Sequence, residues 1–179
     1  SRTGYHERDV VDYGAKNLKF SGGLYWNVTN NIQASLTGNW GSGTSVYTGA
    51  DRYSLKNFSI GQYKLEFKSK NWFLRGYTTQ ENSGDSYAST LASLAVNSAW
   101  KPNVNWFSDY GYVYSDVALS GNGTAAAQAA AHGYARGYAE TGMYAPNTKE
   151  FKAAFDKAVT TPISEGGAQF ADKSSLWQF

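Results

Sequence analysis

Apolar and polar residues alternate strictly along the first half of the chain. In residues 18–28 and 32–40, one set of alternate positions is apolar or small, and the set between them is mostly polar. The apolar set comprises Leu18, Phe20, Gly22, Leu24, Trp26, Val28, Ile32, Ala34, Leu36, Gly38 and Trp40. Because successive side chains of a β-strand point to opposite faces of its sheet, this pattern predicts two strands that share one apolar face. The intervening residues 29–31, Thr-Asn-Asn, favour a tight turn.

Two further strands are predicted at residues 55–68 and 72–81, with a second tight turn at residues 69–71. In the first of these, Tyr63, Leu65 and Phe67 alternate with Lys64, Glu66 and Lys68. Residues 41–53 look like a long connection, because they are rich in Gly, Ser and Thr. Each predicted strand has about the 9 to 11 residues that a tilted strand needs to cross a bilayer. Strands of soluble proteins average about 5 to 6 residues.

The same alternation fits a soluble sandwich with the apolar face inward and a membrane barrel with that face toward lipid. Two features favour the barrel. The predicted connections alternate between short and long, as the turns and loops of outer-membrane barrels do. Aromatic residues also gather near the strand ends of the apolar face, which predicts two lipid-facing belts. The belts comprise Phe20, Trp26, Trp40, Phe67 and Trp72.

The pattern changes in residues 82–173, which we interpret as a helical extracellular insertion. Leu91, Leu94 and Ala95 have helical spacing, whereas the aromatic segment 106–123 looks irregular. Thr124 is the expected N-cap of an alanine-rich helix, and Asn147 with Glu150 fits a capping box. Residues 1–81 are therefore assigned to barrel strands and turns, and residues 174–179 to the start of a further barrel strand. The predicted fold class is all-β: an antiparallel transmembrane β-barrel segment of about five strands with a long, partly helical extracellular loop.

Composition narrows the function classes. The formal net charge of +2 is weak and dispersed, so we expect no nucleic-acid partner. Cysteine is absent, which excludes disulfides and cysteine-ligated metals. Aromatic residues reach 16%, with 14 Tyr and 6 Trp, and these two types suit boundaries between wet and dry surroundings. No apolar run is long enough for a transmembrane helix, and no signal peptide begins the chain, so we expect it to start inside a longer one.

Few residues carry recognisable chemistry. His6 and His132 are too few and too distant for a zinc site, and Glu81 with Asp85 resembles a calcium loop only faintly. We therefore expect no metal and no cofactor. Nothing frames a nucleophile or a carboxylate pair, so we expect no catalytic residues and no enzyme. The candidate substrate-binding residues lie on the polar strand face or in the outer loop: Arg75, Glu81, Trp106, Tyr110 and Tyr112. The two strand residues could instead contact a plug on the polar face. The loop aromatics, Tyr114 included, could instead form the core of the helical insertion.

Four segments together resemble the barrel region of TonB-dependent outer-membrane receptors, specifically the large Bacteroidetes type. They are DYGAKNLKFSGGLYW, VYTGADRYSLKNF, FLRGYTTQENSGDSYAST and GAQFADKSSLWQF. The resemblance covers most of residues 2–100 and 166–179, and RGYTTQENSGDSY is its most specific element. It implies a 22-stranded barrel around an N-terminal plug, located in the bacterial outer membrane. Such a receptor imports a scarce nutrient (siderophore, glycan or peptide) with energy supplied through the TonB complex.

The chain departs from that family pattern because it has no plug, no TonB box and only about five strand patterns. Five strands cannot close a barrel, and open strand edges in lipid would leave backbone groups unpaired. We therefore expect a fragment whose partners are the remaining barrel and plug of the same receptor, outer-membrane lipid and, for some relatives, a surface lipoprotein. The alternatives are a soluble β-rich module that binds glycans or proteins and, less favoured, a complete eight-stranded barrel.

Overall fold

The computed structural model describes residues 1–121, 123–170 and 173–178. It is a mixed α/β structure, 38% helical and 38% strand, so the predicted all-β class is wrong. The described strands form an open antiparallel sheet and not a closed barrel. The chain divides into a helical unit, residues 1–10 and 91–158, and a strand unit, residues 11–90 and 159–179. The finer predicted boundaries at residues 82 and 174 stay a prediction.

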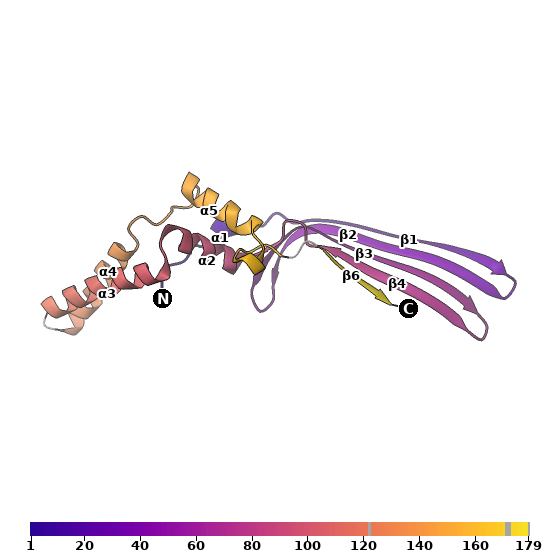
Figure 1. Ribbon diagram of the computed structural model, residues 1–179, viewed down its shortest axis with the longest axis horizontal. Coiled ribbons are helices and arrows are strands. Elements are labelled where there is room, and N and C mark those ends of the chain that lie inside the picture. The colour runs from indigo at the N-terminus through magenta and orange to yellow at the C-terminus, as the bar shows by residue number, and fades with distance from the viewer. Residues whose placement is uncertain (122, 171–172, 179) are drawn as a thin grey trace. The chain divides into compact units, whose positions relative to one another are not determined.

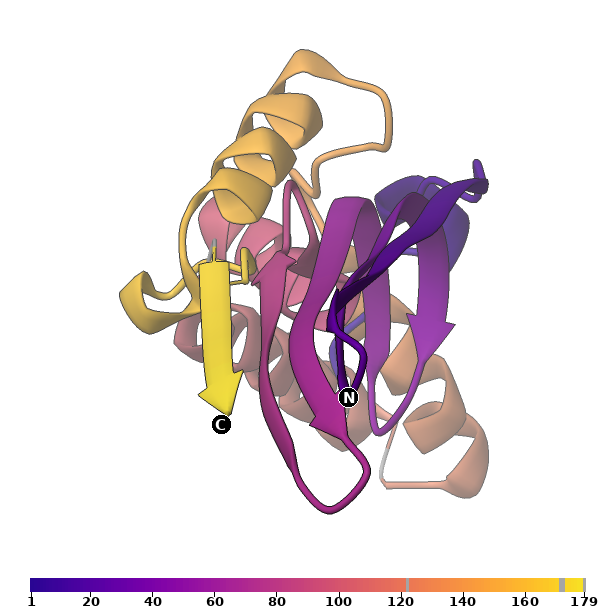
Figure 2. The same cartoon turned by 90° about the vertical axis from the view of Figure 1, so that its right-hand side faces the viewer.

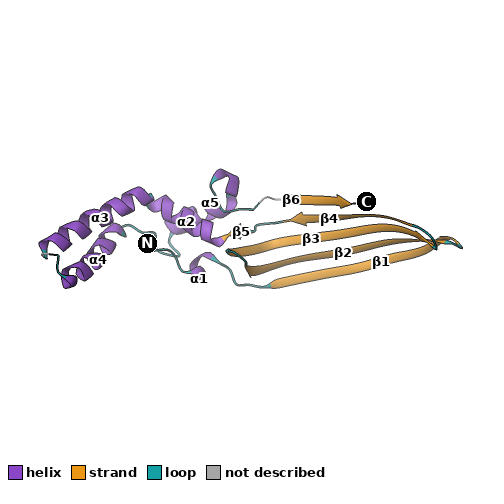
Figure 3. Cartoon of the chain, turned by 90° about the horizontal axis from the view of Figure 1, so that it is seen from below, coloured by secondary structure: helices purple, strands orange, loops and turns teal. Residues whose placement is uncertain are grey.

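The strand unit contains one sheet of long strands: β1 (Lys16–Thr29), β2 (Ile32–Thr48), β3 (Arg52–Ser69) and β4 (Phe73–Asn82). These four strands run side by side as successive antiparallel hairpins (Figure 1). The short β6 (Lys173–Gln178) pairs with β4, beside which it lies in Figure 2, and the two-residue β5 (Tyr87–Ala88) pairs with β3. The order β1-β2-β3-β4-β6 leaves β1 and β6 at the edges of the described sheet, as Figure 3 shows.

The predicted thirteen-residue connection at residues 41–53 is wrong. Strand β2 continues to Thr48 and β3 begins at Arg52, so only residues 49–51 form the turn. Tyr47 and Tyr53 face each other across this hairpin, with stacked rings whose centroids lie 6.0 Å apart. Small Gly, Ser and Thr side chains do not prevent ladder hydrogen bonds, and the paired tyrosines favour strand here. The predicted alternation of short and long connections therefore fails between β2 and β3.

A compact cluster of small residues joins β5 to β3. Ser54, Ser86 and Ala168 are fully buried, and Tyr87 is nearly so. Ser86 Oγ accepts a hydrogen bond from the Lys56 amide at 2.9 Å, and two backbone bonds tie residues 86–88 to residues 168–170. This β5 cluster is the main core in the described part of the strand unit, where few residues of the long strands are buried.

The loop that enters the β5 cluster is a turn closed by side-chain hydrogen bonds. The Asp85 carboxylate accepts a hydrogen bond from the Asn57 side-chain amide at 2.8 Å, and Asn82 Oδ1 accepts one from the Gly84 amide. Gly84 has a positive φ of 57°, and a Cβ there would lie 2.5 Å from the Asn57 carbonyl oxygen. Only glycine fits this position without a shift of the backbone.

The helical unit contains α1 (Glu7–Val10), α3 (Asn103–Ser120) and α4 (Ala125–Ala139), together with most of α2 (Ser89–Trp100) and α5 (Lys149–Thr160). A short 3₁₀ helix, Ile163–Glu165, follows in the strand unit. The segment 103–120, predicted to be largely irregular, is the longest helix. Trp106, Tyr110 and Tyr114 recur every fourth position, so they form one stripe that packs against α4.

Alanines on α4 allow α3 to approach closely. Ala131, Ala135 and Ala139 are completely buried, and so is Trp106 on the facing side of α3. The rings of Trp106, Tyr110 and Tyr114 stack in sequence, with centroid distances of 5.3 and 6.1 Å. The helical hairpin therefore has a core made of small residues on one helix and large flat residues on the other.

The predicted helix caps have mixed outcomes. Thr124 is the N-cap of α4, as expected, because its hydroxyl accepts a hydrogen bond from the Ala127 amide at 3.3 Å. The capping box predicted at Asn147 is wrong by one residue. Thr148 accepts from the Phe151 amide at 3.3 Å, and Asn147 instead has a left-handed φ of 71°.

Candidate functional site

The candidate site is the sheet itself, whose two faces differ sharply in chemistry. Strand register aligns the alternate positions of β1 to β4, so the side chains predicted to share a face do share one. We call the face that bears the large hydrophobic residues the apolar face and the other the polar face. The large apolar-face residues are Leu18, Phe20, Leu24, Trp26, Leu36, Trp40, Tyr63, Leu65, Phe67 and Leu74. Between the rows of Leu18 and Trp26, the apolar faces of β1 to β4 carry no charged side chain among the described residues.

Among the described residues of the strand unit, no second layer covers the apolar face. Trp26, Leu36 and Leu65 lie near its centre and are 44%, 46% and 42% exposed. A soluble sandwich or a helix-covered sheet would bury these side chains almost completely. Contiguous exposed apolar surfaces of this kind mark contact with a membrane or another protein.

The predicted aromatic belts lie at two heights on the apolar face. Phe20 on β1 and Trp40 on β2 are directly opposite in register and stack at 6.0 Å. Trp26 lies six residues further along β1, about 20 Å away at roughly 3.3 Å per residue. Phe67 lies in the same transverse row as Trp26, and Trp72, 49% exposed, precedes β4 beside that row. An outer-membrane strand has a lipid-facing band about 25 Å tall between such girdles.

Tyr63 fills a gap left by glycines on the apolar face. Its ring lies over Gly38 on β2 and Gly61 on its own strand, where added Cβ atoms would meet it at 3.3 and 3.0 Å. Glycine in a strand otherwise leaves a bare patch of backbone, and a neighbouring aromatic ring can cover it. The apolar face therefore stays continuous across these positions.

The polar face carries most of the charged residues of β1, β3 and β4, namely Lys19, Lys64, Glu66, Lys68, Arg75 and Glu81. Arg75 lies opposite Glu66 in register, and its Nη2 is 2.5 Å from Glu66 Oε2. Lys64 Nζ lies 3.8 Å from the other oxygen of that carboxylate, and the Arg75 guanidinium stands over the Phe73 ring at 5.3 Å. A carboxylate between two cations gives this face a net positive centre.

A hollow of about 460 Å³ surrounds Arg75 on the polar face. Its polar lining includes Thr37, Asn39, Gln62, Lys64, Tyr77 and Thr79. Amide, hydroxyl, guanidinium and phenol groups can together bind a polar ligand or a protein surface. Glu81, the second predicted strand residue, lies on the same face opposite Ile60 and outside this lining.

The predicted loop aromatics lie in the helical unit, on two sides of α3. Trp106 and Tyr110 belong to the aromatic stack against α4, together with Tyr114. Tyr112 points away from that stack and is 74% exposed. The structure thus brings Trp106 and Tyr110 together, with Trp106 buried and Tyr110 half-buried, and leaves Tyr112 on the surface.

His132 on α4 contacts the aromatic residues of α3. The Tyr110 hydroxyl forms a short hydrogen bond with His132 Nδ1, whose ring also lies 4.7 Å from the Tyr114 ring. Within the described residues, no group of three or more potential metal-ligating His, Cys, Asp or Glu side chains occurs.

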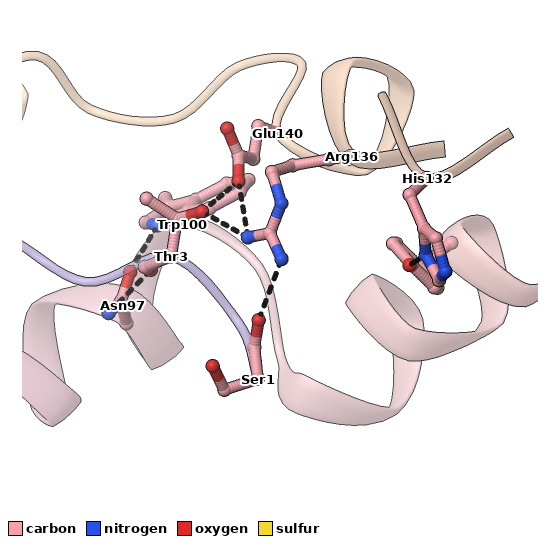
Figure 4. Close-up of polar contacts among 8 residues, drawn as sticks. Ser1, Thr3, Asn97, Trp100, His132, Arg136 and Glu140 are labelled. Carbon is pink, nitrogen blue, oxygen red and sulfur yellow. Dashed lines mark hydrogen bonds and ion pairs between the residues drawn. The ribbon is translucent and has the colours of Figure 1, made fainter. Parts of the chain in front are cut away.

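Sequence reasoning missed a polar network that binds the first residues to the helices (Figure 4). Arg136 on α4 donates to Thr3 Oγ1 at 2.6 Å and to the Ser1 carbonyl at 3.1 Å, and its guanidinium lies 3.4 Å from Glu140. Asn97 on α2 donates to the Thr3 carbonyl at 3.4 Å. These partners are separated by more than 90 residues, except for the Arg136–Glu140 pair, so spacing along the sequence gives no signal for them.

Two further residues of the same segment are held by the helical unit, Arg2 at the end of α2 and Tyr5 between α4 and α5. The Arg2 guanidinium donates to the carbonyls of Lys101 and Asn97, both at 2.6 Å, and desolvation lowers its pKa. The Tyr5 hydroxyl donates to the Tyr144 carbonyl at 3.0 Å, and burial raises the pKa of Tyr5 to about 12. The network can hold a polypeptide segment, and we see no chemistry in it beyond that.

None of the helices in the described part of the chain combines the length and the apolar character needed to cross a membrane. Comparison with protein-family models, with curated proteins and with solved structures found no match to this chain.

Proposed function

We propose that the chain contributes wall strands and one large outer elaboration to a TonB-dependent outer-membrane importer of a nutrient. The apolar face of β1 to β4 contacts lipid, and the polar face lines the water-filled interior or contacts a plug. The observation that carries this proposal is the exposure of Trp26, Leu36 and Leu65 at the centre of a charge-free apolar face. The family resemblance of the strand segments supports it independently.

The energetics of the two environments favour lipid for this face. Each half-exposed large apolar side chain loses part of the roughly 1.5–3 kcal/mol that full burial contributes. Hydrocarbon restores that contribution, whereas water does not. A cation on the lipid face near the midplane costs about 2–4 kcal/mol, and the charged residues Lys19, Lys64, Glu66, Lys68 and Arg75 all lie on the polar face.

The proposal requires partners for the edges of the sheet. Strands β1 and β6 each pair on one side only among the described strands. Backbone groups at a sheet edge cannot remain unpaired in hydrocarbon, so neighbouring strands of the same receptor must pair with them. The plug and the contact with the TonB complex come from other parts of that receptor.

Quenching of single tryptophans by brominated lipid tests the proposal. In variants that keep one tryptophan each, Trp26 and Trp40 should be strongly quenched when the protein is reconstituted in brominated phospholipid vesicles. Trp106 is buried against α4 and serves as the matched control, because it should be quenched little. The same protein without detergent or lipid should aggregate. A monomer in buffer, with no difference in quenching among the three tryptophans, would instead support a soluble β-rich module.

A further inference from the structure

A second hollow lies on the polar face at the end of the sheet far from the β1–β2 turn, and no function described above uses it. Its volume is about 330 Å³. Two transverse rows of the register form it: Asn17, Gly43 and Phe58 in one row, and Lys19, Gly41 and Ile60 in the next. Since β2 contributes only glycines to these rows, the hollow has a floor of bare backbone between taller side chains. We call it the glycine hollow.

Gly41 and Gly43 differ in whether the structure leaves room for a side chain. A Cβ on Gly41 would meet Lys19 Cγ at 3.7 Å and Ile60 Cγ2 at 4.0 Å, which are ordinary contacts. A Cβ on Gly43 would lie 2.8 Å from the Lys16 carbonyl oxygen, which is a clash. Packing therefore requires glycine at 43 but not at 41, and the space above Gly41 is open to another molecule.

The outer wall of the glycine hollow is fixed by an irregularity in β3. The register shifts between Gly43 and Ser45, and Asn57 opposite has a φ of 54°. Asn57 is bound on both sides, because its amide donates to Thr44 Oγ1 at 3.2 Å and its side chain donates to Asp85 at 2.8 Å. Strained bulge residues held in this way often aim neighbouring side chains at a binding site, here Phe58.

The lining has a flat apolar side and a cationic side. Phe58 and Ile60 are half-buried on β3, and Lys19 with Asn17 stands opposite on β1. Lys16 borders the hollow with its backbone carbonyl, because its side chain alternates to the other face of β1. Within the described part of the chain, Lys19 forms no ion pair. No acidic side chain lines the hollow, and Glu81 lies one strand beyond Ile60 on the same face.

We infer that the glycine hollow binds a small ligand with a flat apolar body and one carboxylate. The body lies on the glycine floor against Phe58, and the carboxylate accepts hydrogen bonds from the Lys19 ammonium and the Asn17 amide. This inference deepens the proposed function, because it names a ligand class for the water-facing side of the wall.

The test uses 2-naphthoate as the probe and 2-naphthylmethanol as its neutral analogue, titrated into the protein in lipid vesicles. We expect Lys19→Met to weaken 2-naphthoate binding about fivefold, as for a partly exposed ion pair, and to leave the alcohol unchanged. Gly41→Leu should abolish binding of both probes, and Gly41→Ala, whose Cβ fits without strain, should weaken both. The matched control is Gly22→Leu on the apolar face of β1, where a Cβ meets nothing within 4 Å, and it should change neither.

Equal binding of the acid and the alcohol, or binding that survives Gly41→Leu, overturns the inference. Absence of 2-naphthoate binding at millimolar concentration overturns it as well. Lipid quenching of Trp26 measured on the same vesicles reports separately on the proposed function. If Trp26 is quenched but 2-naphthoate does not bind, the ligand inference is rejected and the proposed function as a barrel wall stands. If Trp26 is not quenched, the proposed function is rejected whatever the result with 2-naphthoate.

Discussion

A charge placed on the apolar face should reveal what that face contacts. Leu36 lies in the row Leu24–Leu36–Leu65, two residues from the row of Trp26 and four residues from Trp40. At about 3.3 Å per residue these separations are roughly 7 and 13 Å along the strand. Leu36 is thus inside the band between the two aromatic belts. Leu36→Arg is the perturbation that follows from this position.

The magnitude of the effect depends on the surroundings. An arginine on the lipid face costs about 2–4 kcal/mol at the midplane and less near the interfaces. Since Leu36 lies nearer to one belt, we expect Leu36→Arg to lower the free energy of unfolding by about 2–3 kcal/mol, roughly a hundredfold in the unfolding equilibrium. If water covers this face instead, the half-exposed leucine can be replaced with a change of about 0.5 kcal/mol or less.

The assay is guanidinium unfolding of the protein in phospholipid vesicles, followed by tryptophan fluorescence. The matched control is Asn39→Arg, which places the same side chain on the polar face of the same strand, opposite the neutral residues Ser21 and Gln62. It should change the free energy by no more than about 0.5 kcal/mol. Equal losses in the two variants, or no loss in either, would refute the assignment of the apolar face to lipid.

Three further predictions concern the helical unit. Ala135→Leu should lower the free energy of unfolding by about 1–3 kcal/mol in thermal melts followed by circular dichroism, because Ala135 is fully buried against α3, and the exposed Tyr134→Leu should have little effect. Thr148→Ala should cost about 1 kcal/mol in the same assay, since it removes the cap of α5, and an unchanged melting temperature would contradict that role. Burial raises the Tyr5 pKa to about 12 from the ordinary value of 10, so the neutral phenol stabilises the fold fully below pH 10, and this contribution is lost as pH rises toward 12. Difference absorbance of tyrosinate between wild type and Tyr5→Phe should show the raised pKa, and a titration near pH 10 would exclude it.

The alternation of residues predicted the strands well because it depends only on local geometry. The partition of Phe20, Leu36 and Leu65 from Lys19 and Lys64 follows from the two-residue period of a strand, which needs no knowledge of tertiary structure. Residues 41–53 were mispredicted for the converse reason. Their Gly, Ser and Thr residues have weak local preferences, and pairing with residues 16–19 of β1 and 52–60 of β3 makes residues 41–48 strand.

Tertiary context also decided the helices and the candidate site. Aromatic residues are mediocre helix formers, so the segment 103–120 looks irregular until the alanines of α4 supply a surface for Trp106 and Tyr110. The hollow around Arg75 and the glycine hollow exist because several strands contribute to one row. Which residues line each hollow depends on the strand register, and a single bulge such as that at Asn57 changes the register.

The sparse interior of the sheet has a consequence for biogenesis. Apart from the β5 cluster, few residues of the long strands are buried, with Ala34, Ser35 and Thr78 among them. Such a sheet gains little by forming alone in water, so under the proposed function we expect membrane insertion and docking of neighbouring strands to drive its assembly. The helical unit has its own packed centre at Trp106 and the α4 alanines. We therefore expect the helices to be able to fold in an aqueous compartment. The strands should still need a chaperone that covers their apolar face until they reach the membrane.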